Sequence, residues 1–312
     1  MVENKSQWKA WLYLLPAIVL LLVFTMWPIV NTVRMALLED YSGLKAAAGQ
    51  SFSFNFNNFR EVMQYGNFIT CLKNTILICF LTVPISTLLA LAIAVALNSI
   101  KPFQKVLQTI FFLPYVTNTI AIGMVFSAMF NIVGNVGTGN DLVVTAGIVN
   151  NIIEFFGGTA VNWINSGSTY TANLIVMVIY IVWNALPFKI LILLGGLQSV
   201  NKQYYDAAKV DGTSRWRVFV KITIPLLSPM LAYVIITGFI AGFKEYTSIV
   251  GIFGEKMGPP DEAGRLNTMV GFIYDNLGKN QGRASAAALI LFGIIFVVTM
   301  VNMQISKKKV HY

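Results

Sequence analysis

Residues Tyr205–Ser228 read YDAAKVDGTSRWRVFVKITIPLLS, a segment that is polar and basic at its start and apolar at its end. Its first part predicts a short helix over Tyr204–Val210, because alanine has the highest helix propensity, and Gly212 permits the turn that ends this helix. Basic and apolar residues then recur at helical spacing up to Pro225, as in a helix that lies at a membrane surface. Two interpretations remain here: a docking element for a partner, or a basic loop that only connects two helices.

The rest of the chain has the composition of a membrane protein. Of its 312 residues, 56% are hydrophobic and 11% are charged, against about 25% charged in soluble domains. A spanning helix needs about 20 apolar residues. Windows of this length lie at residues 10–33, 74–100, 106–131, 171–197, 222–248 and 284–306. We therefore expect an all-α integral membrane protein with six transmembrane helices, organised as a single transmembrane domain over residues 1–312.

The distribution of Lys and Arg predicts the orientation of the chain. The segments before the first span, after the second, after the fourth and after the sixth are strongly basic, whereas the alternate loops hold about as many acids as bases. Because cytoplasmic loops retain positive charge, both termini and Tyr205–Ser228 are expected in the cytoplasm. This distribution accounts for the net charge of +9 without a nucleic acid, so we expect membrane lipid and no nucleic acid as a partner. The first window is longer than the core of a signal peptide, so we expect it to be retained.

Patterns for catalysis and metal binding are mostly absent from the sequence. The single His is His311, which leaves no candidate for a His-based triad. Residues 134–139 are rich in Gly but lack the Lys-Ser/Thr of a phosphate-binding loop, and are expected in an external loop. Cys71 and Cys79 fit small apolar fillers better than a disulfide or metal site. We therefore expect no enzyme activity, metal or cofactor in this chain, and any ATP and Mg²⁺ must be used by another subunit.

Placed in the cytoplasm, Tyr205–Ser228 resembles the coupling loop, or EAA loop, of permease subunits in ABC importers. Its matching residues are Ala207, Ala208, Asp211, Gly212, Phe219, Pro225 and Pro229. Asp206, Thr213 and Ile224 replace the usual Glu, Ala and Leu. The stretches Phe111–Tyr115, Gly195–Ser199 and Ala284–Ala287 are similar to the sugar-transporting branch, which includes the larger permease subunit of the maltose importer.

The resemblance implies a type I, binding-protein-dependent importer in a bacterial cell membrane. Two permease chains would pair, as a heterodimer here, above two ATPase subunits, and an extracellular solute-binding protein would deliver a sugar or oligosaccharide. The coupling helix would lie in segment 204–224, between the fourth transmembrane helix and the fifth. Its implied ATPase contacts are Asp206, Ala207, Ala208, Asp211 and Gly212.

Polar residues inside the spans are candidates for a substrate site, because they are costly in lipid and usually face a cavity, and aromatic residues are candidates because their faces suit the C–H faces of sugar rings. The candidates are Tyr115, Thr119, Asn184, Phe188, Lys189, Gly242, Lys244 and Glu245. Tyr115 and Thr119 are four residues apart and would share one face of the third span. Pro187 predicts a local break in the fourth span, beside Phe188 and Lys189.

The resemblance to maltose-type sites carries over Tyr115, Thr119, Phe188, Gly242 and Glu245. Glu245 replaces a neutral amide, which favours a different sugar, such as a charged or amino sugar. Alternatives stay open for several candidates. Phe188 fits simple helix packing as well, and Lys244 and Glu245 fit pairing with neighbours or snorkelling to the interface. Lys189 lies well inside the fourth apolar window and is expected to face the cavity or an acidic partner.

Two other classes of protein remain as alternatives. An ion-coupled secondary transporter would carry acidic residues inside its spans, for which only Glu245 is a candidate. A membrane scaffold that transports nothing would not need the Asp-Ala-Ala to Asp-Gly segment. Association with an ATPase, and transport that depends on ATP hydrolysis, would separate an importer from both.

Overall fold

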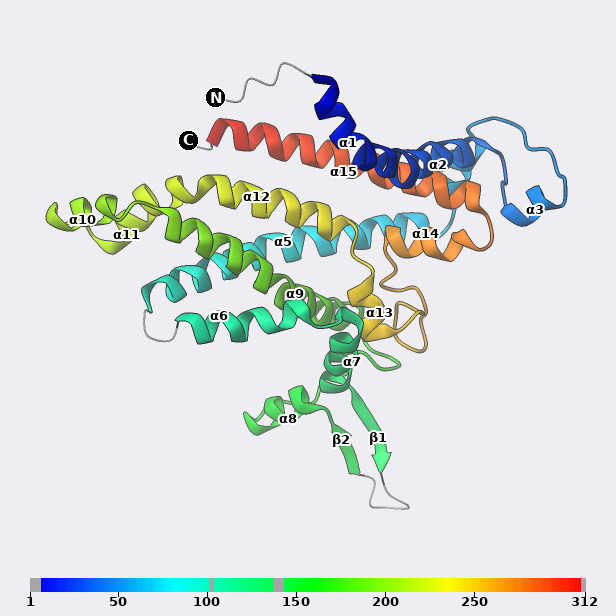
Figure 1. Ribbon diagram of the computed structural model, residues 1–312. Coiled ribbons are helices and arrows are strands. Elements are labelled where there is room, and N and C mark those ends of the chain that lie inside the picture. Colours follow the sequence, from blue (N-terminus) through cyan, green and yellow to red (C-terminus); the bar gives the residue numbers. More distant parts are fainter. Residues whose placement is uncertain (1–6, 101–103, 137–142, 310–312) are drawn as a thin grey trace. The chain divides into compact units, whose positions relative to one another are not determined.

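The computed structural model describes residues 7–100, 104–136 and 143–309 of the chain (Figure 1). Apart from one hairpin, the regular secondary structure of these residues is helical. The chain divides into two compact units. The first takes the residues up to Ile69 together with Phe272–Gly293, and the second takes Thr70–Gly271 and the residues from Ile294 onward.

Five helices among the described residues are long and apolar enough to cross a membrane: Trp8–Leu37, Phe68–Ser99, Tyr170–Ser199, Arg215–Phe243 and Gln281–Lys307. A sixth span is present only if the bent pair Val106–Val116 and Thr119–Phe130 is counted as one crossing. The predicted all-helical membrane architecture is thereby confirmed.

The predicted third span, residues 106–131, is not one continuous helix. Its two halves meet at an angle of 98°. The first half, α6 (Gln104–Phe112), ends in a short 3₁₀ helix, η2 (Leu113–Val116), and Asn118 then caps α7 (Thr119–Phe130) by accepting hydrogen bonds from two backbone amides of that helix. Because Asn at an N-cap starts a new helix, the chain turns here instead of continuing.

The first unit is built from the helices at the start of the chain and the ends of two later ones. They are α1 (Gln7–Leu21), η1 (Leu22–Met26), α2 (Trp27–Leu37), α3 (Gly43–Ala47), α4 (Asn57–Gln64), α14 (Met269–Leu277) from Phe272 onward and α15 (Gln281–Lys309) up to Gly293. Arg283 of α15 pairs with Glu61 of α4 at 2.9 Å and lies 4.9 Å above the ring of Tyr65. These contacts tie α15 to α4.

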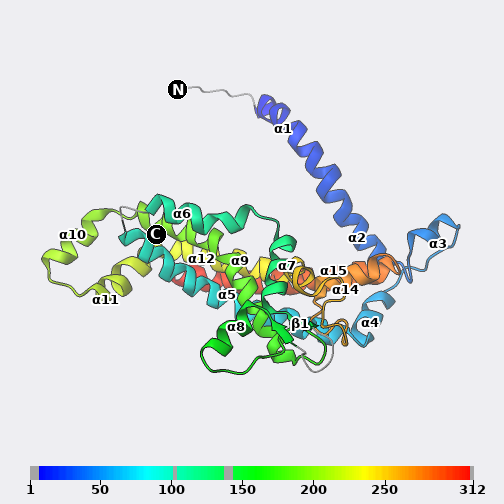
Figure 2. The same cartoon turned by 90° about the horizontal axis from the view of Figure 1, so that it is seen from below.

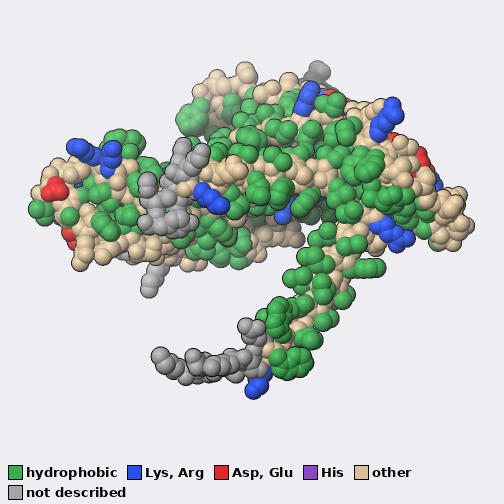
Figure 3. All heavy atoms as spheres, turned by 90° about the horizontal axis from the view of Figure 1, so that it is seen from above, with side chains coloured by type: hydrophobic (Ala, Val, Ile, Leu, Met, Phe, Trp, Pro, Cys, Tyr) green, Lys and Arg blue, Asp and Glu red, His purple; other side chains and the backbone are tan. Residues whose placement is uncertain are grey.

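Helices α1, η1 and α2 form one rod, visible in Figure 2. The most apolar stretch of this rod contains no buried residue. Figure 3 shows hydrophobic side chains along the face of the rod that is in view. A helix that is apolar and exposed in this way needs lipid or another protein around it.

Two spans contain a π-helical turn that ends two residues before a proline. In η1 the amide of Trp27, the residue before Pro28, donates to the carbonyl of Leu22. In η3 (Phe219–Thr223) the amide of Ile224, the residue before Pro225, donates to Phe219 in the same way. Proline has no amide hydrogen, and a π-turn shifts the pairing by one residue without ending the helix.

Besides the first three residues of α14 and the part of α15 from Ile294 onward, the second unit holds the remaining elements. They are α5 (Phe68–Ser99), α6, η2, α7, β1 (Ile132–Val136), β2 (Val143–Ala146), α8 (Ile148–Phe155), α9 (Tyr170–Ser199), α10 (Lys202–Val210), α11 (Arg215–Val218), η3, α12 (Ile224–Phe243) and α13 (Thr247–Phe253). Strands β1 and β2 pair antiparallel, with Ile132 opposite Ala146. Gly134, which was expected in a loop, lies in β1, and residues 137–142 of the predicted loop lie outside the described residues.

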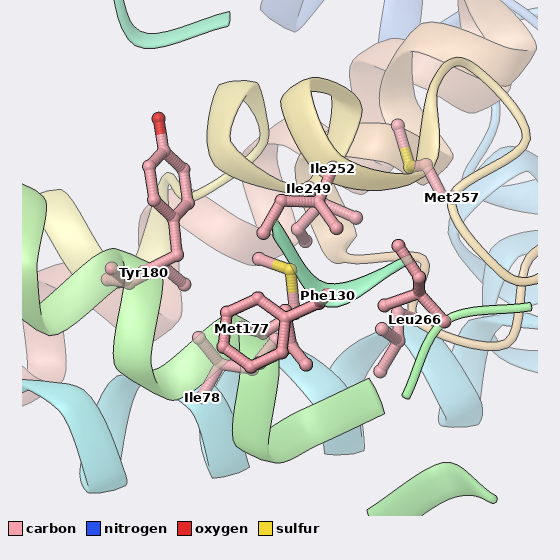
Figure 4. Packing of buried hydrophobic residues seen from close by; sticks show 11 residues of the cluster. Ile78, Phe130, Met177, Tyr180, Ile249, Ile252, Met257 and Leu266 are labelled. Atoms are coloured by element: carbon pink, nitrogen blue, oxygen red, sulfur yellow. The ribbon is translucent and has the colours of Figure 1, made fainter. Parts of the chain in front are cut away.

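Two apolar cores hold the second unit together. One joins α7, α9 and α13, where Met177, Tyr180 and Ile249 are fully buried (Figure 4). The other joins α5, α9 and α12 and includes Leu193 and Leu227. Together they fix α9 against α5, α12 and α13, the elements that position the cavity described next.

Candidate functional site

A cavity of about 360 Å³ lies in the second unit, against α5, α9 and α12. Six of the eight predicted substrate residues line it: Tyr115, Asn184, Phe188, Lys189, Gly242 and Glu245. The sequence predicted these residues on three different spans, and the fold brings all six to the same cavity. A cavity of this size suits a small ligand or part of a longer one.

Two aromatic rings form one side of the cavity. The rings of Tyr115 in η2 and Phe188 in α9 lie 5.9 Å apart with an interplanar angle of 18°. Tyr115 is 52% exposed. Aromatic faces of this kind bind the C–H faces of apolar or sugar rings.

Lys189 lies in the wall of the cavity and is 5% exposed. Its ammonium donates to the carbonyl of Val83 at 3.2 Å, to Ser86 Oγ at 2.6 Å and to Thr87 Oγ1 at 2.9 Å. An ammonium has three hydrogens to donate, and these three acceptors match that number. Lys189 therefore lies at the cavity, and its partners in α5 are hydroxyl and carbonyl groups. The acidic partner that the sequence left open is not among them.

The carboxylate of Glu245 lies where α12 gives way to α13. Its Oε1 accepts hydrogen bonds from the amides of Tyr246 and Ser248, both at 3.1 Å. The backbone carbonyl of Glu245 also accepts from Thr268 Oγ1 at 2.9 Å. Glu245 is thus held in place at the edge of the cavity by the first turn of α13.

Two of the predicted substrate residues do not line the cavity. Thr119 begins α7 beyond the bend, and its carbonyl accepts a hydrogen bond from the hydroxyl of Tyr180. Tyr115 and Thr119 therefore do not share a helix face, because the chain turns between them. Lys244 is exposed and lies outside the lining of the cavity. The break predicted at Pro187 is also wrong, since α9 continues from Tyr170 to Ser199.

Sequence reasoning missed the polar residues that α5 and α12 contribute to the cavity: Thr82, Ser86 and Thr237. Thr82 and Ser86 are four residues apart in an apolar span, which places them on one helix face. This spacing of two polar residues on one face of an apolar span could have indicated the cavity from the sequence. Gly238 was missed as well, and a Cβ there would lie 3.3 Å from Lys189 Nζ.

The predicted coupling segment forms α10, a turn and α11. The turn is a Schellman motif, in which Gly212 has φ +63°, its amide donates to Lys209 and the amide of Thr213 donates to Ala208. Ala208 is buried, whereas Asp206, Ala207 and Asp211 are exposed. Helix α10 begins at Lys202, after the cap Asn201, two residues before the start at Tyr204 predicted from the sequence, and Asp206 lies in its second turn.

Residues 83–311, which include the coupling segment and every lining residue of the cavity except Thr82, match the family described as "Binding-protein-dependent transport system inner membrane component". The chain belongs to this family. The permease is 28% identical to the arabinooligosaccharides transport system permease protein AraP of Bacillus subtilis, over 95% of this chain and 88% of that protein. It is also 28% identical to the trehalose/maltose transport system permease protein MalF of Thermococcus litoralis, over 95% of this chain and 93% of that protein.

A solved structure has the same fold as the permease. It is a bacterial alginate ABC transporter in complex with an alginate pentasaccharide-bound periplasmic protein, and one of its chains matches with a TM-score of 0.75 and 21% identity. The match covers 97% of the permease and 96% of that chain. At this identity the likeness shows the fold alone.

Family membership decides between the classes of protein left open by the sequence. The permease is a multi-pass inner membrane component of an ABC importer, and neither an ion-coupled secondary transporter nor a scaffold. ATP hydrolysis resides in a separate ATPase subunit, and the family carries no cofactor of its own. Among the residues that the structure describes, no group of three or more His, Cys, Asp or Glu side chains could hold a metal ion.

Proposed function

We propose that the permease forms half of the translocation pathway for a sugar or oligosaccharide in an ATP-driven importer. The observation that carries this proposal is the stacked pair of Tyr115 and Phe188 in one cavity with Asn184 and Glu245. The rings offer apolar faces to a sugar, and the amide and carboxylate offer partners for its hydroxyls. The relatives named for arabinooligosaccharides and for trehalose and maltose support the same class of substrate.

The proposed assembly contains a second, different permease chain, two ATPase subunits and an extracellular solute-binding protein. Both termini and α10 lie in the cytoplasm, and residues 1–312 act as one permease domain. The exposed residues Asp206, Ala207 and Asp211 contact the ATPase, while Ala208 and Gly212 fix the shape of the segment that presents them.

The proposal is tested by uptake of labelled arabinotriose, maltose and trehalose into vesicles that contain the reconstituted complex. Phe188→Ala removes one ring of the stacked pair and should lower uptake of the accepted sugar roughly tenfold. Glu245→Ala should lower it as well, without loss of assembly. Leu191→Ala, on an exposed face of the same helix, is the control.

Uptake at the wild-type rate in both Phe188→Ala and Glu245→Ala would contradict the proposal that this cavity is part of the translocation pathway. Uptake that continues when ATP hydrolysis is blocked would remove the ATP-driven mechanism.

A further inference from the structure

A second cavity, of about 610 Å³, lies beside the coupling segment. Its lining comes from the end of α5, from α10 and the turn after it, from α11 and from η3: Val95, Tyr205, Lys209, Gly212, Thr213, Arg215, Val218, Phe219 and Thr223. Figures 1 and 2 both show α10 and α11 at the same end of α9 and α12. The proposed sugar pathway does not use this cavity.

The polar part of the lining is built to receive an anion. Lys209 and Arg215 supply two positive charges, and the described lining residues include no acid. Tyr205, Thr213 and Thr223, each of which carries a hydroxyl group, are part of the same lining. Guanidinium, ammonium and hydroxyl groups together form the usual set of donors to phosphate oxygens.

The remaining lining is apolar and lies at the end of two membrane spans. Val95 is near the end of the span Phe68–Ser99, and Val218 and Phe219 are at the start of the span Arg215–Phe243. Trp216 is 74% exposed, and its ring lies 5.7 Å from that of Phe219. Exposed Trp beside basic residues is typical of the membrane–water interface, which favours a position of this cavity at the depth of the lipid headgroups.

The π-turn shapes this cavity. Phe219 and Thr223, the first and last residues of η3, both line it, and the hydroxyl of Thr223 lies 3.3 Å from that of Tyr205 in α10. The cavity therefore touches both the helix proposed to meet the ATPase and the first turns of the fifth span. π-turns occur frequently at functional sites.

We propose that this cavity binds the headgroup of an anionic phospholipid, with the phosphate against Lys209 and Arg215 and the first part of an acyl chain against Val95, Val218 and Phe219. Basic pockets between transmembrane helices on the cytoplasmic side bind lipid headgroups in this way. The proposal rests on the cytoplasmic placement of α10 in the proposed function. The bound lipid links α10 to the fifth span, so the transfer of motion between ATPase and permease depends on anionic lipid.

The test compares two double variants of the full complex that remove equal charge from the same segment. Lys209→Gln/Arg215→Gln removes the cations that line the cavity, and Lys202→Gln/Arg217→Gln removes two that do not. Each complex is purified, exposed to phosphatidylglycerol or phosphatidylcholine, and examined by native mass spectrometry for retained lipid. ATP hydrolysis is then measured in nanodiscs of both lipids.

Wild type and Lys202→Gln/Arg217→Gln should retain phosphatidylglycerol and hydrolyse ATP faster in its presence. Lys209→Gln/Arg215→Gln should retain it roughly thirtyfold more weakly and lose the stimulation. The same spectra report subunit composition. If the cavity double variant loses a subunit, Arg215→Gln alone is compared with Arg217→Gln alone.

Equal retention of phosphatidylglycerol by the two double variants would overturn the site. Displacement of the lipid by millimolar inorganic phosphate, with phosphate alone giving full stimulation, would assign the cavity to a soluble anion and also overturn it. Either result leaves sugar uptake by the wild-type complex intact, so failure of the lipid site is distinct from failure of the proposed function.

Discussion

Lys189 shows how a charged side chain is accommodated inside a span. Ser86 and Thr87 donate their own hydroxyl hydrogens to backbone carbonyls of α5, Thr82 and Val83 respectively, and accept from Lys189 with their lone pairs. The hydroxyls are therefore oriented by α5 itself. Lys189 ties α9 to α5 next to the proposed sugar pathway.

Replacing Lys189 by Met should leave the complex about as stable as the wild type, because the hydroxyls keep their carbonyl partners and a buried charge is replaced by an apolar chain of similar length. Ser86→Ala/Thr87→Val should instead leave the ammonium short of acceptors and cost a few kcal/mol. Adding Lys189→Met to that pair should restore most of the stability. The measurement is the thermal unfolding midpoint of the purified complex; a drop in Lys189→Met as large as in Ser86→Ala/Thr87→Val would contradict this account.

The residues of the cavity were partly predictable from sequence. Lys189 and Glu245 stood out because charged groups are costly inside an apolar window, and Phe188 stood out because an aromatic face suits a sugar ring. The acceptors of Lys189 did not stand out, because Ser and Thr in a span commonly bond to their own helix. Ser86 lies 103 residues before Lys189, and only the packing of α5 against α9 brings the two together.

Among the elements, the third span departs most from the sequence analysis. Residues 106–131 form a continuous apolar window, and Pro114 alone did not indicate a bend, since Pro84 in α5 and Pro187 in α9 lie inside unbroken helices. Neighbouring helices satisfy the backbone groups that a proline frees. The bend instead lies where Asn118 caps the start of α7. Hydropathy predicts that a segment enters the membrane, but it does not predict where the helix turns.

The turn after α10 can be tested with two substitutions of Gly212 that should impair coupling to different extents. Gly212 has φ +63°, a conformation that costs most side chains about 1–2 kcal/mol but that Asn tolerates. Gly212→Val should reduce the ATPase that co-purifies with the permease and its rate of hydrolysis, whereas Gly212→Asn should reduce both only slightly. Gly49, with φ +79° in the first unit, provides the control as Gly49→Val. The same ATPase yield from Gly212→Val as from wild type would exclude a role for this turn in docking.

At the scale of the whole molecule, the basic segments alternate with loops of balanced charge along the entire chain. The proposed ATPase contact and the proposed lipid site both depend on which side of the membrane each segment occupies. Cys71 and Cys79 are buried, at 1% and 0% exposure, so a single introduced cysteine can report on it.

An impermeant maleimide added to intact cells should label Glu255→Cys and not Gln203→Cys, and in inside-out vesicles the result should reverse. Both positions are exposed. The physical reason is the retention of Lys and Arg on the cytoplasmic side during insertion. Labelling of Gln203→Cys from outside the cell would contradict the predicted orientation, and with it both the ATPase proposal and the lipid proposal.

The hydrogen bonds of Lys189 also bear on how the protein is made. A lysine at the centre of an isolated helix costs about 2.5–3.5 kcal/mol for entry from the translocon into the bilayer. Its acceptors belong to α5, which precedes α9 in the chain and so leaves the ribosome first. The receiving hydroxyls are thus already in the membrane when Lys189 arrives, and the order of synthesis lowers the barrier to inserting the fourth span.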